Sequence, residues 1–289
     1  MTTATARATE ELLPGFAERR TTVRAVSTRY FLGGEGPPLV LVHGLSGAAT
    51  NFCELAPLLA RRRRVLIPEL PGHGGSTPLP AAPTLNGYAD RVLGVAELEG
   101  MLPAPLVGHS LGGSISLRAA LRRPVDVPAV VLAASAGIAS ATRWAQFWLA
   151  VLGRVKPGRR IAPHRSVVAE NGLLRTLVFG HWGASDPGAL SDRAVRGLLA
   201  GPELHTDTMS AARALVRDDP RQDLHGVHCP CLVLWGARDN QVPIDDAFQY
   251  ARRLRAPLRV IADCGHLLVA ERADACVEAI EAFLDGLGI

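Results

Sequence analysis

Residues 105–121 read PLVGHSLGGSISLRAAL, and this stretch decides the fold more than any other part of the chain. The apolar run Pro105–Val107 leads into a glycine-rich turn, Gly108–Gly113, and then into an alanine- and leucine-rich run with helical spacing. The turn fits the pattern G-x-S-x-G, in which glycines let a strand and a helix meet at a sharp angle without Cβ clashes. Such a turn holds the Ser110 hydroxyl clear of the backbone, at a helix N-terminus that favours developing negative charge. Ser110 is therefore the candidate nucleophile.

The alternation of strand and helix continues on both sides of this turn. Runs without a polar residue are typical of parallel strands that are covered on both faces. Strands are expected at Leu39–Val42, Val65–Ile67, Ala129–Ala133, Cys231–Trp235 and Leu258–Ile261, and helices at Asn51–Ala60, Leu85–Met101, Leu111–Leu121, Asp245–Leu254 and Ala273–Leu287. This order predicts an α/β fold: a doubly wound, mostly parallel sheet with helices on both faces. Ahead of it, residues 1–20 are expected to form a polar arm and Val23–Leu32 a single strand.

The alternation stops between Gly137 and Gly226, where the sequence is helical or irregular. We expect residues 137–226 to form a helical cap inserted between two strands, with residues 1–136 and 227–289 as the core. Open α/β sheets bind ligands at the carboxyl ends of their strands, which is where a cap would lie. Trp144, Phe147 and Trp148 share one helix face by their spacing, so they are candidates for the substrate pocket. Packing the cap onto the core explains these aromatics equally well.

A serine hydroxyl is a poor nucleophile unless a base, itself oriented by a third group, removes its proton. Asp239 follows the expected strand Cys231–Trp235, and His266 follows Leu258–Ile261. Together with Ser110, these residues lie in loops at the carboxyl ends of strands, in the order Ser, Asp, His. The sequence therefore predicts a catalytic triad with His266 as base and Asp239 as the orienting acid.

Other acids could replace Asp239. Asp245 and Asp246 follow Pro243, where a helix should begin, so N-capping is the better interpretation of both. Asp263 is a weaker rival because of its placement. No acid follows the preceding strand, since residues 133–146 contain neither Asp nor Glu.

An oxyanion hole needs two fixed donors near the nucleophile. We expect one to be the backbone N–H of Leu111 and the other that of Leu45, in the loop His43–Gly47. His43 is expected to hold this loop by hydrogen bonds. His43 and His109 are both assigned to the structure or lining of the pocket, and neither is taken as a second base.

These motifs resemble the α/β-hydrolase superfamily from about Val23 to Leu287. The segments that carry the resemblance are His43-Gly44, Pro71–Ser76, the turn Gly108–Gly113, the acid loop Gly236–Pro243 and Cys264-Gly265-His266. Members with an aspartate at the nucleophile position, such as epoxide hydrolases and dehalogenases, differ from this chain, which has Ser110. The sequence also departs from the commoner pattern at Glu69, where members more often have Asp.

The leading hypothesis is hydrolysis of a carboxylic ester or related acyl bond through an acyl-enzyme, with an apolar small-molecule acyl substrate, whose chain length the sequence leaves open, as partner. A biosynthetic thioesterase, acyltransferase, cyclase or C–C bond hydrolase could use the same triad. A third interpretation is a non-catalytic ligand-binding protein, against which the ordered Ser, Asp and His argue. The expected chemistry needs no metal or organic cofactor.

Composition excludes several other classes. The net charge of +4 comes from dispersed arginines without interleaved aromatics, which disfavours a nucleic-acid groove. No run of eighteen apolar residues predicts a membrane span, and no signal-peptide stretch opens the chain. Five irregularly spaced cysteines do not suggest disulfides, so a cytoplasmic location is expected. His225, His228, Cys229 and Cys231 could suggest zinc, but alternate residues of a buried strand cannot all reach one metal. The oligomeric state stays open.

Overall fold

The computed structural model describes residues 11–80, 83–139, 157–180 and 183–289. Their strands form one eight-stranded sheet in the order β1-β2-β4-β3-β5-β6-β7-β8. The strands from β4 to β8 run parallel, whereas β2 is antiparallel to both β1 and β4. The predicted doubly wound, mostly parallel sheet is confirmed. Its strands are β1 (Phe16–Val23), β2 (Val26–Gly33), β3 (Pro38–Val42), β4 (Arg64–Pro68), β5 (Leu106–His109), β6 (Val130–Ala133), β7 (Cys231–Gly236) and β8 (Leu258–Ile261).

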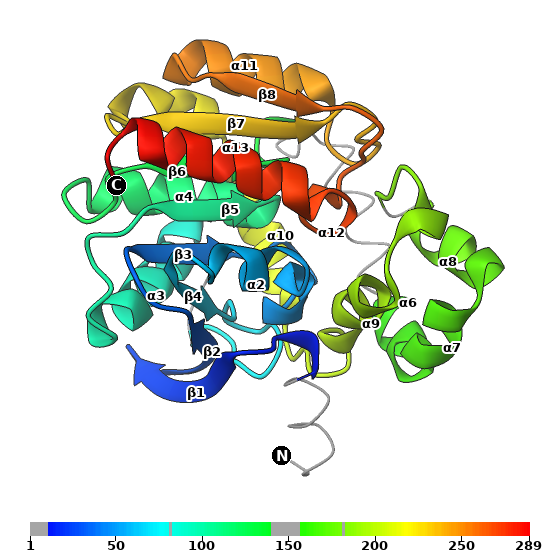
Figure 1. Ribbon diagram of the computed structural model, residues 1–289. Helices are drawn as coiled ribbons and strands as arrows, with labels where there is room; N and C mark the ends of the chain where they lie inside the picture. Colours follow the sequence, from blue (N-terminus) through cyan, green and yellow to red (C-terminus); the bar gives the residue numbers. More distant parts are fainter. Residues whose placement is uncertain (1–10, 81–82, 140–156, 181–182) are drawn as a thin grey trace.

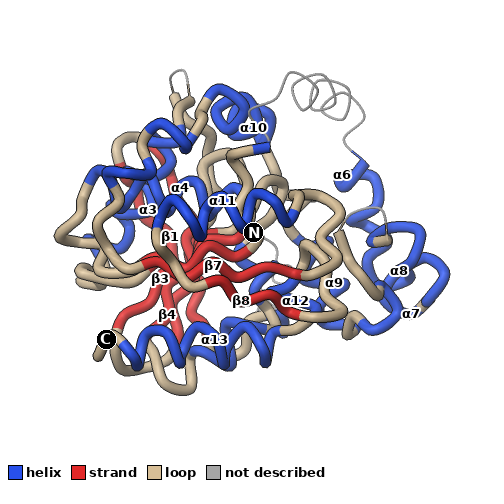
Figure 2. The backbone as a smooth tube through the Cα atoms, turned by 90° about the horizontal axis from the view of Figure 1, so that it is seen from above, coloured by secondary structure: helices blue, strands red, loops and turns tan. Residues whose placement is uncertain are grey.

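Helices cover both faces of this sheet (Figure 2), so the central strands have no polar face. On one side lie α3, α4 and α11, and on the other lies α13, which packs against α2. The residues of β5, β6 and β7 are all buried. The bounds of the core helices are α2 (Leu55–Leu59), α3 (Leu85–Leu98), α4 (Leu111–Arg122), α11 (Ile244–Leu254), α12 (Leu268–Glu271) and α13 (Ala273–Gly286).

The strand expected at Val23–Leu32 corresponds largely to β2, but the expected polar arm was wrong from Phe16 onward, where a further strand lies. Residues from Phe16 onward form β1, and a two-residue turn at Arg24 and Ala25 reverses the chain into β2. Both turn residues have left-handed backbone (φ +47° and +66°), as the favoured two-residue hairpin turns require. Neither residue is the Gly or Asn that is typical of such a turn, so the sequence pattern does not predict it.

The helix expected at Asn51–Ala60 is also divided in two. A short 3-10 helix, Ala49–Phe52, precedes α2 (Leu55–Leu59). Asn51 lies inside the first of these, where its Oδ1 accepts a hydrogen bond from the Ala48 N–H at 3.2 Å. Asn51 therefore closes the loop after β3 and does not begin a long helix.

The described residues between β6 and β7, here called the insertion, contain helices and no strand. They form their own apolar cluster around Phe179 and Leu199, which also contacts Leu267 of the core. Figure 1 shows α7, α8 and α9 on the side toward which β5 and β7 point. The longer insertion helices are α6 (Pro157–Ile161), α7 (Arg165–Glu170), α8 (Gly172–Phe179), α9 (Asp192–Ala200) and α10 (Thr208–Arg217). Trp144, Phe147 and Trp148 lie outside the described residues.

Candidate active site

Ser110 lies in the sharp turn between β5 and α4. Its backbone has φ +54° and ψ −119°, a strained conformation that surrounding contacts must maintain. The Ser110 N–H donates to Ala133 O at 2.9 Å, and its carbonyl accepts from the Ala136 N–H at 3.1 Å. A Cβ on Gly108 would overlap the carbonyl of Gly112, so glycine is required for the close approach of strand and helix.

His266 and Asp239 form a hydrogen-bonded pair. Nδ1 of His266 lies 2.8 Å from Oδ2 of Asp239, whose side chain is completely buried. The other carboxylate oxygen, Oδ1, accepts from the N–H groups of Gln241 at 2.8 Å and Val242 at 2.9 Å. Because an ionised carboxylate can only accept, the proton of the neutral imidazole lies on Nδ1 and leaves Nε2 as the basic atom.

Ser110 and His266 line the same cavity. Within the described parts of the chain, no hydrogen bond joins Ser110 Oγ to His266. Catalytic contacts of this kind are often longer without substrate and tighten when it binds. The structure therefore places Ser110 and His266 on one cavity, with Asp239 hydrogen-bonded to the other side of the His266 ring.

The loop that carries His266 is held from three sides. The His266 N–H donates to Gly183 O of the insertion at 2.6 Å, and the carboxylate of Glu271 accepts from the Gly265 N–H at 3.1 Å. Nε2 of His109 donates to the His266 carbonyl at 2.9 Å. Burial lowers the pKa of His109 to about 3, so this ring stays neutral and supports the loop. Glu271 has no sequence motif that would have revealed this contact.

Leu45 and Leu111 lie at two backbone positions with free donors. Leu111 is the first residue of α4, where helix geometry leaves the N–H without a partner. Leu45 lies in the turn Gly44–Gly47, closed by a hydrogen bond from Gly47 N to Gly44 O at 3.1 Å, and it lines the cavity. Among the described residues, neither N–H has an acceptor.

His43 does not reach the cavity, contrary to its assignment as a pocket residue. It is fully buried behind the turn, where Nδ1 donates to Gly44 O at 2.9 Å and Nε2 accepts from the Leu70 N–H at 3.0 Å. Each ring nitrogen is engaged with the backbone, so His43 connects β3 to the loop after β4. Burial lowers the pKa of His43 to about 4.

The cavity around Ser110 has a volume of about 490 Å³, within the usual size for small-molecule sites. The core contributes polar lining residues, among them Ser110 and His266, and the insertion contributes most of the apolar lining together with polar residues such as Arg159, His205 and Asp207. The apolar lining residues of the insertion are Phe179, Leu198, Leu199, Pro202, Met209 and Ala212.

A model of the alpha/beta hydrolase family matches residues 39–279 of this chain. The chain belongs to the alpha/beta hydrolase family. A relative from Pseudomonas putida, the dihydrolipoyllysine-residue acetyltransferase component of an acetoin cleaving system, is 31% identical over 93% of the chain and 70% of its own length. A pimeloyl-[acyl-carrier protein] methyl ester esterase from Chromobacterium violaceum is 32% identical over 73% of the chain and 79% of its own length.

Solved structures agree on the fold of this hydrolase. The crystal structure of a putative lipase from Acinetobacter baumannii superposes with a TM-score of 0.75 at 21% identity, covering 99% of this chain and 96% of the other. A sequence identity this low supports a similarity of fold and nothing further.

The rival acids of the hydrolase make other contacts. Asp246 is buried and accepts from the Ala139 N–H at 2.8 Å, while Asp263 pairs on the surface with Arg238 at 2.6 Å. The expectation that Asp245 or Asp246 caps α11 was wrong, because Pro243 occupies the cap position without a side-chain hydrogen bond.

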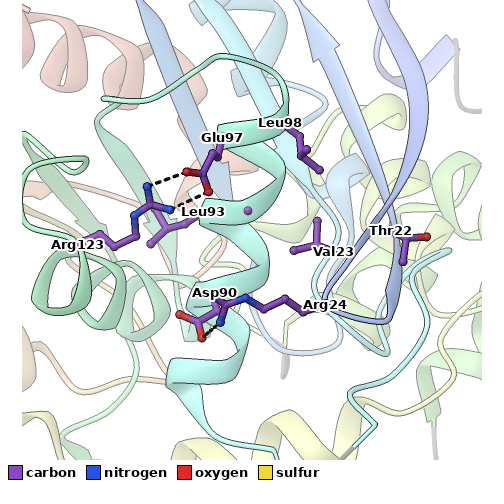
Figure 3. A pocket seen from close by; sticks show the side chains of 9 residues that line it. Thr22, Val23, Arg24, Asp90, Leu93, Glu97, Leu98 and Arg123 are labelled. Atoms are coloured by element: carbon purple, nitrogen blue, oxygen red, sulfur yellow. Dashed lines mark hydrogen bonds and ion pairs between the residues drawn. The ribbon is translucent and has the colours of Figure 1, made fainter.

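A second hollow, of about 270 Å³, lies between the β1–β2 turn and α3 and shares no residue with the Ser110 cavity. Figure 3 shows its charged side chains joined in pairs, Arg24 with Asp90 and Arg123 with Glu97. These groups are already satisfied by one another and give the hollow no distinctive chemistry. Within the described ranges, no cluster of His, Cys, Asp and Glu suits a metal ion, and no helix is long and apolar enough to cross a bilayer.

Proposed function

We propose that this hydrolase cleaves a carboxylic ester or a closely related acyl bond through a covalent acyl-enzyme. The observation that carries the proposal is the buried contact between Asp239 and His266 beside the strained Ser110 turn. This arrangement supplies a nucleophile, a base of defined tautomer and an acid that orients the base.

In the first step, Ser110 Oγ bonds to the acyl carbon while Nε2 of His266 takes the hydroxyl proton. The carbonyl oxygen becomes an oxyanion, which the N–H groups of Leu45 and Leu111 stabilise. When the tetrahedral intermediate collapses, the bond to the leaving group breaks and His266 returns the proton to that group. Asp239 remains ionised throughout and stabilises the imidazolium.

In the second step, His266 removes a proton from water, whose oxygen attacks the acyl-enzyme. When the second tetrahedral intermediate collapses, its bond to Ser110 Oγ breaks, His266 returns the proton to that oxygen, and the carboxylic acid leaves. The scheme requires no metal or cofactor.

We further propose that the insertion acts as a cap that selects the substrate. Phe179, Leu198 and Leu199 give the cavity apolar walls, which supports an apolar acyl or alcohol group. The reacting groups come from the core, so the division into core and cap separates chemistry from substrate choice.

A serine-directed fluorophosphonate probe tests the proposal. It should label the wild-type protein at Ser110 and leave Ser110→Ala unlabelled. The activity of the same variant on p-nitrophenyl acetate should be more than about a thousandfold lower than that of the wild type, while its circular dichroism spectrum should show that it is folded. A binding-only protein would neither react with the probe nor turn over any ester.

A panel of esters and thioesters of increasing chain length then defines the reaction. Adding a competing alcohol distinguishes hydrolysis from acyl transfer, because a transferase would form the new ester in preference to the free acid. Full activity of Ser110→Ala would contradict the proposed function.

A further inference from the structure

His205 lies between α9 and α10, and its ring connects two loops of the core. Its Nδ1 accepts a hydrogen bond from the Gly74 N–H at 2.9 Å. Its Nε2 lies 2.8 Å from Ser46 O, and because a carbonyl only accepts, Nε2 carries the proton. Both ring nitrogens are thus engaged with the backbone, in a single neutral tautomer.

The segment that carries His205 is itself fixed to the core. The backbone N–H groups of Thr206 and Asp207 both donate to Gly72 O at 3.0 Å. The ring of His73 packs between two others, with its centroid 5.4 Å from that of His205 and 5.3 Å from that of His43. Burial lowers the pKa of His205, which keeps the ring in the form that can accept from Gly74.

The loop that His205 contacts is strained. Ser46 has φ +56°, in the left-handed region, at the third position of the turn Gly44–Gly47, where glycine is the usual residue. A non-glycine residue costs about 1–2 kcal/mol in this conformation, so a contact from outside the turn helps to hold it. His205 makes that contact, on the carbonyl of Ser46 itself.

We propose that His205 is a positioning residue for the oxyanion hole: through Ser46 O it holds the Gly44–Gly47 turn in the conformation that aims the Leu45 N–H at the acyl oxygen. The inference rests on the proposed function, since it assigns the Leu45 N–H to the oxyanion. It also connects the insertion, which supplies His205, to the catalytic rate. His205 itself has no free polar atom with which to bind substrate.

Two conservative variants separate the two contacts of the ring. In His205→Gln the side-chain amide nitrogen can occupy the position of Nε2 and donate to Ser46 O. In His205→Asn the shorter side chain can accept from Gly74 at the position of Nδ1 but does not reach Ser46. His225→Asn is the matched control, because His225 is an exposed histidine outside the cavity.

The measurement is kcat and KM for p-nitrophenyl acetate, with the unfolding midpoint of each variant. We expect His205→Asn to lower kcat about 10- to 100-fold with little change in KM, because a displaced donor weakens only transition-state binding. His205→Gln should restore kcat to within about threefold of wild type, a difference of under 1 kcal/mol. The control should match wild type.

Three results would overturn the inference: unchanged kcat in His205→Asn, an effect confined to KM, or equal losses in folded Asn and Gln variants. None of them involves Ser110. The proposed function is tested separately by Ser110→Ala, whose full activity would overturn that proposal and this inference together.

Discussion

Replacing Asp239 by Asn isolates the orientation of His266 from every other property of the site. In the wild type, Oδ1 of Asp239 accepts from the N–H groups of Gln241 and Val242, and Oδ2 faces His266 Nδ1 at 2.8 Å. The amide oxygen of Asn would remain on the two backbone donors, because its NH₂ group cannot accept from them. The NH₂ group would then face His266.

Two donors cannot face each other at 2.8 Å, so Nδ1 of His266 would have to become the acceptor. The imidazole proton would move to Nε2, where it blocks removal of the Ser110 proton. We expect kcat to fall by about 10⁴, equivalent to about 5.4 kcal/mol of transition-state stabilisation. The fold should change in stability by only about 1 kcal/mol, since the hydrogen bonds to the backbone persist.

The assay is steady-state hydrolysis of p-nitrophenyl acetate, together with urea unfolding. Matched controls are Asp246→Asn, whose amide oxygen can still accept from Ala139, and Asp263→Asn, which affects only an exposed ion pair worth about 0–1 kcal/mol. Both controls should remain active. A mild Asp239→Asn variant beside an inactive but folded Asp246→Asn or Asp263→Asn would refute the assignment.

Three further predictions concern the cavity and the buried histidines. Leu45→Ala should change kcat little, because the donor is a backbone group. Leu45→Pro removes the N–H at a turn position that suits proline, and it should lower kcat about 10²- to 10³-fold. Equal rates for the two variants would exclude the Leu45 N–H as an oxyanion donor. Phe179→Leu should alter the ratio of rates for butyrate and acetate esters, on the scale of about 1–3 kcal/mol for one pocket contact, and an unchanged ratio would remove Phe179 from the substrate pocket. Burial lowers the pKa of His43 to about 4 and of His109 to about 3, so each contributes stability that is complete above pH 6.5 and is lost as the pH falls toward those values. In urea titrations, the shifted pKa of each histidine should lower the free energy of unfolding by about 2 kcal/mol as the pH falls from 6.5 to 5. His109→Gln can still donate to the His266 carbonyl but does not titrate, so the free energy of unfolding should depend less on pH in this variant. An unchanged dependence on pH would contradict the contribution assigned to the buried, neutral His109 ring.

The sequence was most informative where local chemistry and strand order act together. The turn around Ser110 requires glycine at positions 108 and 112, and those residues are visible without a structure. The expected strand Leu258–Ile261 agrees with β8 in both bounds. Asp239 and His266 could be selected because parallel strands end at one edge of the sheet.

The remaining features depend on contacts between distant segments, which no local pattern encodes. Arg24 and Ala25 turn the chain because β1 and β2 pair, although neither residue favours that conformation. The sequence predicted Asp246 as a helix cap, but its carboxylate accepts a hydrogen bond from the N–H of Ala139, at the start of the insertion. His205 lies in a segment without periodicity, and only the packing of the insertion brings it to Ser46.

The insertion leaves the sheet after Ala133 at the end of β6 and returns before Cys231 at the start of β7, and these two strands are parallel neighbours in the sheet. Replacing the segment between these two strands would leave the order of the strands in the sheet unchanged. In this enzyme, replacing the insertion would also remove His205, whose ring is hydrogen-bonded to Ser46 O. If the insertion selects the substrate and His205 positions the Leu45 N–H, as proposed, an insertion transplanted from another member would change the substrate preference and also slow acylation, unless residues 204–207 were retained.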